Sequence, residues 1–159
     1  MDPFIEIAEL ESLWQGDRAA FYVLSRRSKW GDLIAEQVIQ PLKRDEPQAV
    51  EDAVIYLEAN GRYFRSGYAK ARTAAILKSK TLTEAQRVRL REVLLAAPES
   101  PKIGSEFVEY ARLALVVGDG TFFRKLAKQA DTDDPRTQAR CQWILNLYAH
   151  HGSHSRTSR

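Results

Sequence analysis

The feature of this sequence that most constrains its fold is a series of helix-length segments bounded by residues that start and stop helices. Thr83 and Gln86 form a capping box, in which each side chain is expected to bond the backbone N–H of the other residue. Asp134 followed by Pro135 is typical of a helix start, and we expect Gly118 to end a helix. Apolar residues recur at helical spacing inside the segments, and no stretch alternates convincingly in the manner of a β-strand. The sequence therefore predicts an all-α chain.

Further positions divide the rest of the chain into segments of similar length. Proline lacks the backbone N–H that a helix needs and clashes with the preceding turn, so we expect Pro41 and Pro98 to end helices. We expect Asn60-Gly61 to end a helix, because glycine is the favoured left-handed stop, and Gly31 with Asp32 to separate two helices. These boundaries predict about eight helices joined by short loops.

The length and composition of the chain indicate a single domain. It has 159 residues, of which 44% are hydrophobic and 28% charged, which is enough to build one buried core. We expect one helical domain over residues 1–149. Residues 150–159 contain no apolar anchor, so we expect this C-terminal tail to be disordered.

Three helix openings recur at an even spacing. Pro47, Thr83 and Asp119 lie 36 residues apart, and each opening is followed by two expected helices. A period of this length is typical of an α-solenoid, in which stacked helix pairs share a core. The expected caps of the second helices lie at different distances from these openings. An irregular bundle of helical hairpins therefore stays as the alternative. The caps are Ser66, Ser105 and Asp134.

The segment DTDDPRTQARCQWILNLY resembles the second helix of a HEAT repeat, which opens with Asp-Pro and carries small or apolar residues four positions apart. Those positions here are Thr137, Cys141 and Leu145, and the segment DEPQAVEDAVIYL repeats them at Ala49, Ala53 and Leu57. The chain departs from the family because Thr137-Gln138 and Ala49-Val50 stand where a Val-Arg pair is usual. The resemblance implies a HEAT-like solenoid used for binding, and it implies no activity.

Charge is distributed unevenly along the chain. Residues 62–91 contain nine Lys or Arg and one acidic residue, Glu84, which makes this basic segment +8 in a chain of net charge +3. Such a separation creates a directional field and a candidate face for an anionic partner, either nucleic acid or an acidic protein surface. The candidate binding residues are Arg62, Arg65, Lys70, Arg72, Lys78, Arg87 and Arg91.

Two readings of this basic segment stay open. Tyr63, Phe64 and Tyr68 lie among the cations, and aromatic side chains beside arginine can stack on the bases of single-stranded nucleic acid. The alternative is a solvated helix face, with Tyr68 in the core and the cations paired with acidic residues near the N-terminus. Those acidic residues are Asp2, Glu6, Glu9 and Glu11.

No pattern of residues indicates catalysis, a metal or a cofactor. The three histidines all lie at 150–154, beyond the expected domain, and the single cysteine, Cys141, lies on an apolar helix where we expect it in the core. Paired carboxylates such as Glu106 and Glu109 could act in acid–base catalysis only inside a pocket. The sequence indicates no such pocket, so we expect both to lie on an exposed helix face.

These observations predict a non-enzymatic interaction module that binds another protein through its helix faces, with nucleic-acid binding by the basic segment as the alternative. We expect a cytoplasmic protein, because the N-terminus is acidic and no apolar stretch approaches the roughly 18 residues that cross a bilayer. The oligomeric state is left open.

Overall fold

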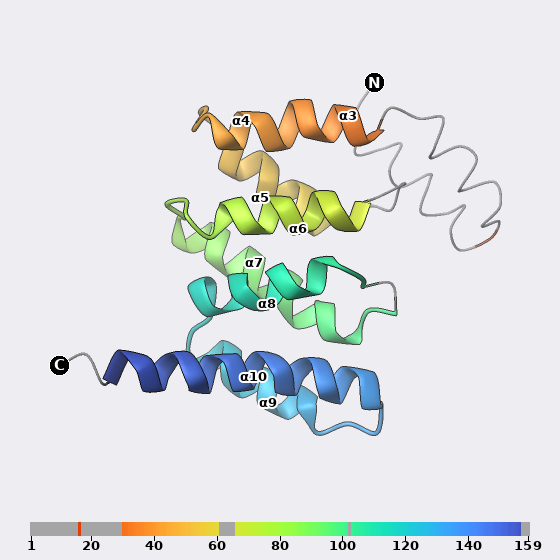
Figure 1. Cartoon of the computed structure of the whole chain (residues 1–159), viewed down its shortest axis with the longest axis vertical. Helices are drawn as coiled ribbons and strands as arrows, with labels where there is room; N and C mark the ends of the chain where they lie inside the picture. Colours follow the sequence, from red (N-terminus) through yellow and green to blue (C-terminus); the bar gives the residue numbers. More distant parts are fainter. Residues whose placement is uncertain (1–15, 17–29, 61–65, 102, 157–159) are drawn as a thin grey trace.

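The computed structural model describes residues 16, 30–60, 66–101 and 103–156, and Figure 1 shows their arrangement. Every regular element among them is helical, which confirms the predicted all-α class. The elements are α3 (Trp30–Ile34), the π-helix η1 (Ala35–Ile39), α4 (Gln40–Lys43), α5 (Ala49–Ala59), α6 (Ser66–Leu77), α7 (Glu84–Ala96), the 3₁₀-helix η2 (Ala97–Glu99), α8 (Glu106–Val117), α9 (Gly120–Ala130) and α10 (Pro135–Arg156). The described residues thus form seven packed helices, if α3, η1 and α4 count as one.

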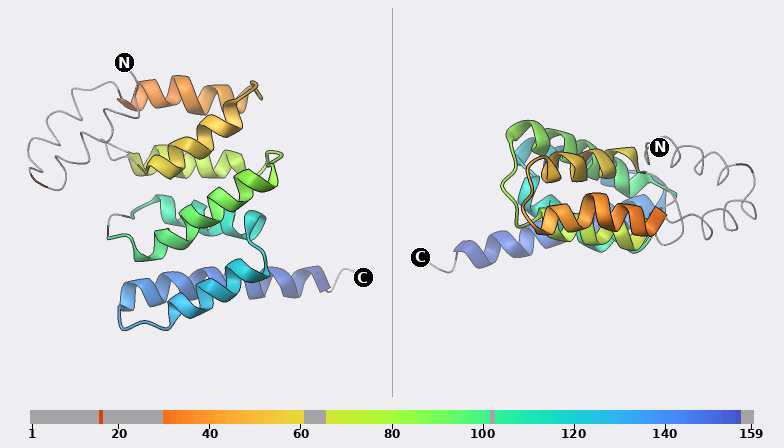
Figure 2. Two further views of the ribbon diagram at one scale, coloured as in Figure 1. Left: turned by 180° about the vertical axis from the view of Figure 1, so that it is seen from behind. Right: turned by 90° about the horizontal axis from the view of Figure 1, so that it is seen from above.

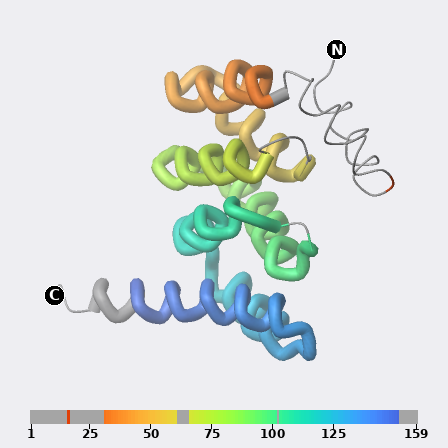
Figure 3. Tube along the Cα trace, turned by 45° about the vertical axis from the view of Figure 1, so that its right-hand side comes forward, coloured from red at the N-terminus to blue at the C-terminus, as the bar shows by residue number. Residues whose placement is uncertain are grey.

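The helices lie in two layers that the chain visits alternately. The first layer contains α5, α7 and α9, and the second layer contains the run from α3 to α4 followed by α6, α8 and α10 (Figures 1 and 2). Figure 3 shows the same stack from a view turned by 45°, and Figure 1 shows that the C-terminal part of α10 projects beyond its neighbours. Helix α6 packs mainly on α8, and α9 packs mainly on α10.

A single apolar core runs between the two layers from Ile34 in α3 to Ile144 in α10. Tyr56, Leu90 and Leu113 lie within it with no exposed surface. Cys141 is also fully buried, so its predicted place in the core is confirmed. Removal of this apolar surface from water is the main term that favours folding.

The predicted helix openings at Thr83 and Asp119 are confirmed by local geometry, whereas α5 begins at Ala49, two residues after Pro47, with no side-chain cap. Thr83 caps α7, because its Oγ1 accepts from the Gln86 N–H at 3.2 Å while the Gln86 Oε1 accepts from the Thr83 N–H at 3.0 Å. Asp119 caps α9, because its Oδ1 accepts from the Phe122 N–H at 2.8 Å. Helices α5, α7 and α9 begin at residues 49, 84 and 120, so their starts are separated by 35 and 36 residues.

Helices α6 and α8 bury the same pattern of positions. Five buried positions of α6 recur 40 residues later in α8, although the residue types differ. They are Ser66, Lys70, Thr73, Ala74 and Leu77 in α6, and Glu106, Tyr110, Leu113, Ala114 and Val117 in α8. The two helices therefore present equivalent faces to the core.

Several predicted helix boundaries are wrong. Gly31 and Asp32 lie inside α3, and Pro41 lies inside α4 instead of ending a helix. The π-helical turn before Pro41 explains the difference, because its wider hydrogen-bonding pattern accommodates a residue without an N–H. The predicted end of a helix at Asn60-Gly61 is confirmed for Asn60, which follows α5 with φ of 48°, whereas Gly61 lies outside the described residues.

The end of the domain also differs from the prediction. Helix α10 continues to Arg156, so most of the segment 150–159 that we expected to be disordered is helical. The helix begins at Pro135 as predicted, and the Asp134 carboxylate accepts from the Thr137 N–H at 3.3 Å and from its hydroxyl at 2.6 Å.

Candidate functional site

The basic segment supplies the first candidate site, and the structure places its members in different environments. Arg62 and Arg65 lie outside the described residues. Lys70 has no exposed surface, and its Nζ donates to the Asn60 Oδ1 at 2.8 Å. A lysine in this position faces the interior of the fold, so it does not contribute to an external face for anions. From the sequence we expected Lys70 on the surface because lysine is charged, although its position on α6 faces the core.

Two further cations of the segment, Lys78 and Arg91, pair with carboxylates. The Lys78 Nζ lies 2.9 Å from the Glu109 Oε2, which links α6 to α8. This contact, chiefly through its hydrogen bond, holds the pKa of Glu109 below its ordinary value. Arg91 lies 2.9 Å from Glu84 and 3.5 Å from Asp119, and its Nε donates to a carbonyl oxygen at the end of α8.

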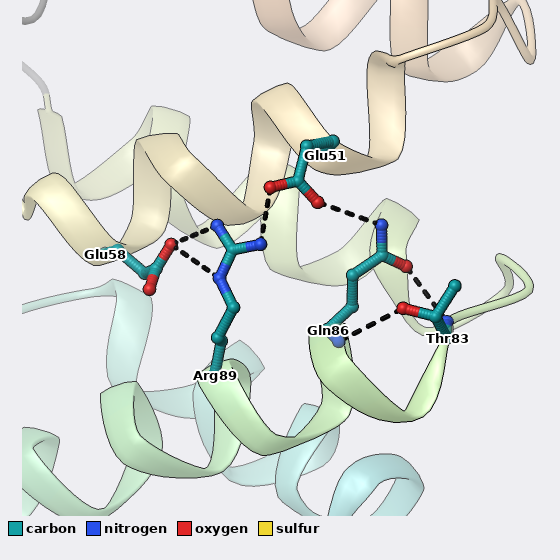
Figure 4. A network of polar contacts seen from close by, with 5 residues as sticks. All are labelled: Glu51, Glu58, Thr83, Gln86 and Arg89. Carbon is teal, nitrogen blue, oxygen red and sulfur yellow. Dashed lines mark hydrogen bonds and ion pairs between the residues drawn. The ribbon is translucent and has the colours of Figure 1, made fainter.

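Arg89 joins the two first-layer helices α5 and α7 (Figure 4). Its guanidinium bonds Glu51 through Nη1, and it bonds Glu58 through both Nη2 and Nε, the last at 3.0 Å. Gln86 adds a bond of 3.2 Å from its Nε2 to the second oxygen of Glu51. The Arg89 hydrogen bond is the main cause of a lowered pKa at Glu51, and Glu58 and Glu51 raise the pKa of Arg89. The pair Glu51 and Arg89 therefore stays charged over the physiological range.

The remaining candidates of the basic segment differ in exposure. The Arg87 Nη1 donates to the Val116 carbonyl oxygen at 2.9 Å, so this half-buried cation also contacts α8. Arg72 is the only one of the five described candidates in the exposed class. The described cations therefore do not converge on one surface, and most of them connect helices. Whether any cation pairs with Asp2, Glu6, Glu9 or Glu11 concerns residues that lie outside the described part.

The second-layer face supplies another candidate site, which we define by Tyr68, Arg72, Val108, Arg112 and Trp143. Tyr68 is 68% exposed, so its predicted place in the core is wrong, and Val108 and Trp143 are 40% and 39% exposed. Val108 and Arg112 follow Tyr68 and Arg72 by the same 40 residues that relate the buried positions of α6 and α8. The Trp143 ring lies 5.4 Å from the Phe107 ring, which connects α10 to α8 at this face.

A cavity of about 290 Å³ is the third candidate, at the ends of α5 and α7 and the start of α8. Glu106 lines it and is only 3% exposed, so the prediction that Glu106 lies on an exposed face is wrong. Its Oε2 accepts from the Gly104 N–H at 3.2 Å and lies against Gly67 in the first turn of α6. The positive end of that helix dipole favours a carboxylate at this position.

The described residues offer little support for metal or nucleophilic chemistry. They contain no group of three or more His, Cys, Asp or Glu that could hold a metal ion. Burial raises the pKa of the Cys141 thiol to about 11, so this thiol stays protonated near neutral pH. None of the described helices is long and apolar enough to cross a membrane.

Comparison with known proteins found no matching family model, no matching curated protein and no matching solved structure. The candidate sites therefore depend on the geometry of this chain alone. Sequence reasoning missed Val108, Arg112 and Trp143, because each is an ordinary member of its own helix. The 40-residue relation between α6 and α8 is the signal that could have found the first two.

Proposed function

We propose that this protein is a non-enzymatic scaffold that binds another protein through the second-layer face. The supporting observation is that Tyr68, Val108 and Trp143 are exposed on three consecutive helices of one layer. Tyrosine, tryptophan and arginine are the residue types that contribute most to binding at protein interfaces, and all three occur here. A partner that presents apolar side chains together with carboxylates would complement this composition.

We further propose that the helices form a short HEAT-like α-solenoid. The support is the near-constant spacing of the first-layer helix starts, together with the repeated burial pattern in α6 and α8. In such an arrangement each helix pair contacts chiefly its neighbours, and the stack presents a continuous surface for recognition. The use of Lys78, Arg89 and Arg91 as contacts between helices is consistent with this role.

Affinity purification with matched variants tests the proposed partner surface. The second-layer variant carries Tyr68→Ser and Trp143→Ser, and the control carries Ile55→Ser and Val88→Ser, which remove exposed apolar side chains from α5 and α7 of the first layer. We expect a protein that co-purifies with the wild type and the control to be lost from the second-layer variant. Equal retention by both variants, or no partner of the wild type, would contradict the proposal.

Single-stranded nucleic acid is the second candidate ligand, and one observation favours it. Tyr68 and Arg72 lie four residues apart on α6, and both are exposed. An exposed ring can stack on a base while the guanidinium contacts a phosphate. This candidate uses less of the basic segment than the sequence predicted, because Lys70 is buried and Lys78 and Arg91 are paired.

Fluorescence anisotropy with a labelled oligonucleotide separates this candidate from the first. Binding through Tyr68 and Arg72 predicts that Arg72→Glu reduces affinity, and that the wild-type affinity falls steeply between 50 and 200 mM salt, a range in which phosphate contacts are weakened. Lys125→Glu is the control, because Lys125 is an exposed cation on α9. Equal effects of the two substitutions would indicate non-specific attraction and would reject this candidate.

A further inference from the structure

We propose that the cavity between α5, α7 and α8 binds a small ligand with an ammonium group joined to an apolar group. This inference goes beyond the proposed scaffold function, because none of the residues of the second-layer face lines the cavity. Its volume of about 290 Å³ lies at the small end of the range for ligand sites, which suits a ligand of a few heavy atoms.

The wall of the cavity gives it an apolar part. Leu57 comes from α5, Val93 from α7, and Ile103 from the segment before α8. Leu57 is almost fully buried, and Val93 and Ile103 are partly buried against the core. These side chains can cover the apolar group of a ligand and exclude water from it.

Glu106 gives the cavity its charge. Glu106 is buried, with only 3% of its surface exposed, and its Oε2 accepts from the Gly104 N–H at 3.2 Å. Within the part of the chain that the structure describes, this is the single hydrogen bond of the Glu106 side chain, and no Lys or Arg pairs with it. A buried carboxylate is costly without a cation, so a ligand ammonium group that donates to its other oxygen gains a charge-assisted bond.

The other polar groups of the wall favour the same ligand class. Glu58 contributes a second carboxylate, and Arg89 bonds only its Oε1, which leaves Oε2 as an acceptor. The Lys70 ammonium group donates to the Asn60 Oδ1 at 2.8 Å, so this buried cation has a wall residue as an acceptor. The Arg89 guanidinium and the Lys70 ammonium group balance the charge of the Glu58 and Glu106 carboxylates, so the preference for an ammonium group depends on the carboxylate oxygens of the wall that no described residue bonds.

Binding of benzylamine and benzyl alcohol tests the ligand class on the full chain. The two molecules have nearly the same shape, and only the amine is cationic at pH 7. We expect saturable binding of benzylamine in a ¹H–¹⁵N NMR titration, with the largest shifts at Gly104 and Glu106, and an affinity for benzyl alcohol at least about tenfold weaker. Undetectable binding of benzylamine, or equal affinity for the two compounds, would overturn the proposal.

Two substitutions locate the bound amine. Glu106→Gln keeps the size of the side chain and an acceptor for the Gly104 N–H, and we expect it to weaken benzylamine binding by at least about tenfold. Glu99→Gln removes an exposed carboxylate that does not line the cavity, and we expect no change. Val93→Trp fills the cavity and should abolish binding of both compounds. If benzylamine binds equally to the Glu106 and Glu99 variants, the proposal is wrong, whatever the outcome for the second-layer face.

Discussion

Replacement of Arg89 by methionine removes the cation that joins α5 to α7 while it keeps an unbranched apolar stem. The Arg89, Glu51 and Glu58 side chains are 31%, 34% and 38% exposed, so solvent screens their attraction. A partly exposed ion pair contributes about 0.2–1 kcal/mol to the free energy of unfolding. Because Arg89 bonds two carboxylates, we expect Arg89→Met to lower this free energy by about 0.4–2 kcal/mol. For a protein of this size, that loss lowers the Tm by about 1–8 °C.

Urea unfolding followed by circular dichroism measures this loss, and a double-mutant cycle with Glu51→Gln isolates the pair. We expect a coupling energy of about 0.5–1 kcal/mol that shrinks at 1 M NaCl, because salt screens exposed charges. Arg72→Met is the matched control on α6, since Arg72 is exposed, and we expect it to change stability by less than about 0.5 kcal/mol. Equal stability of the Arg89 and Arg72 variants would refute the reasoning that the described cations connect helices.

Three further predictions concern packing, pH and thiol reactivity. Gly118→Ala should lower the free energy of unfolding by about 1–3 kcal/mol in urea, because a Cβ would lie 2.6 Å from the Ala114 carbonyl oxygen and 2.7 Å from the Phe123 ring; unchanged stability would contradict this. Folding lowers the pKa of Glu51 and Glu109 from an ordinary 4.5, so their contribution is complete above pH 4.5 and is lost as pH falls through the lowered values. We therefore expect the urea midpoint to decrease when the pH is lowered from 5 to 3, and a midpoint that stays constant or rises would contradict this. Cys141 should react with a thiol reagent only after unfolding, since it is buried and its pKa is about 11, and rapid reaction of the native protein would place the thiol elsewhere.

Local signals predicted part of this fold correctly. The capping box at Thr83 and the end of α7 before Pro98 depend on interactions within one turn of helix, so the sequence contains all that is needed to predict them. The position of Pro41 within a helix could not be predicted in this way. It depends on the π-helical turn before it, which a cap-and-stop pattern does not reveal.

The candidate sites depend on contacts between helices, and for this reason the sequence predicted them less well. Charge alone does not distinguish Lys70, which is buried, from Arg72, which is exposed two positions later. The buried Glu106 carboxylate accepts from the Gly104 N–H and lies against Gly67, which belongs to another helix. The nine cations are clustered in the sequence, whereas the partners of the described ones depend on how the helices pack against one another.

Site-specific photo-crosslinking tests the proposed partner surface most directly. A photoreactive phenylalanine analogue replaces Tyr68 or Trp143 on the second-layer face, and Ile55 or Val88 on α5 and α7 as controls, all of which are exposed positions. The proposed function predicts that positions 68 and 143 give a crosslink to the same protein, and that positions 55 and 88 give none. A crosslink to that protein from positions 55 and 88 alone would place the partner on the first layer and contradict the proposal.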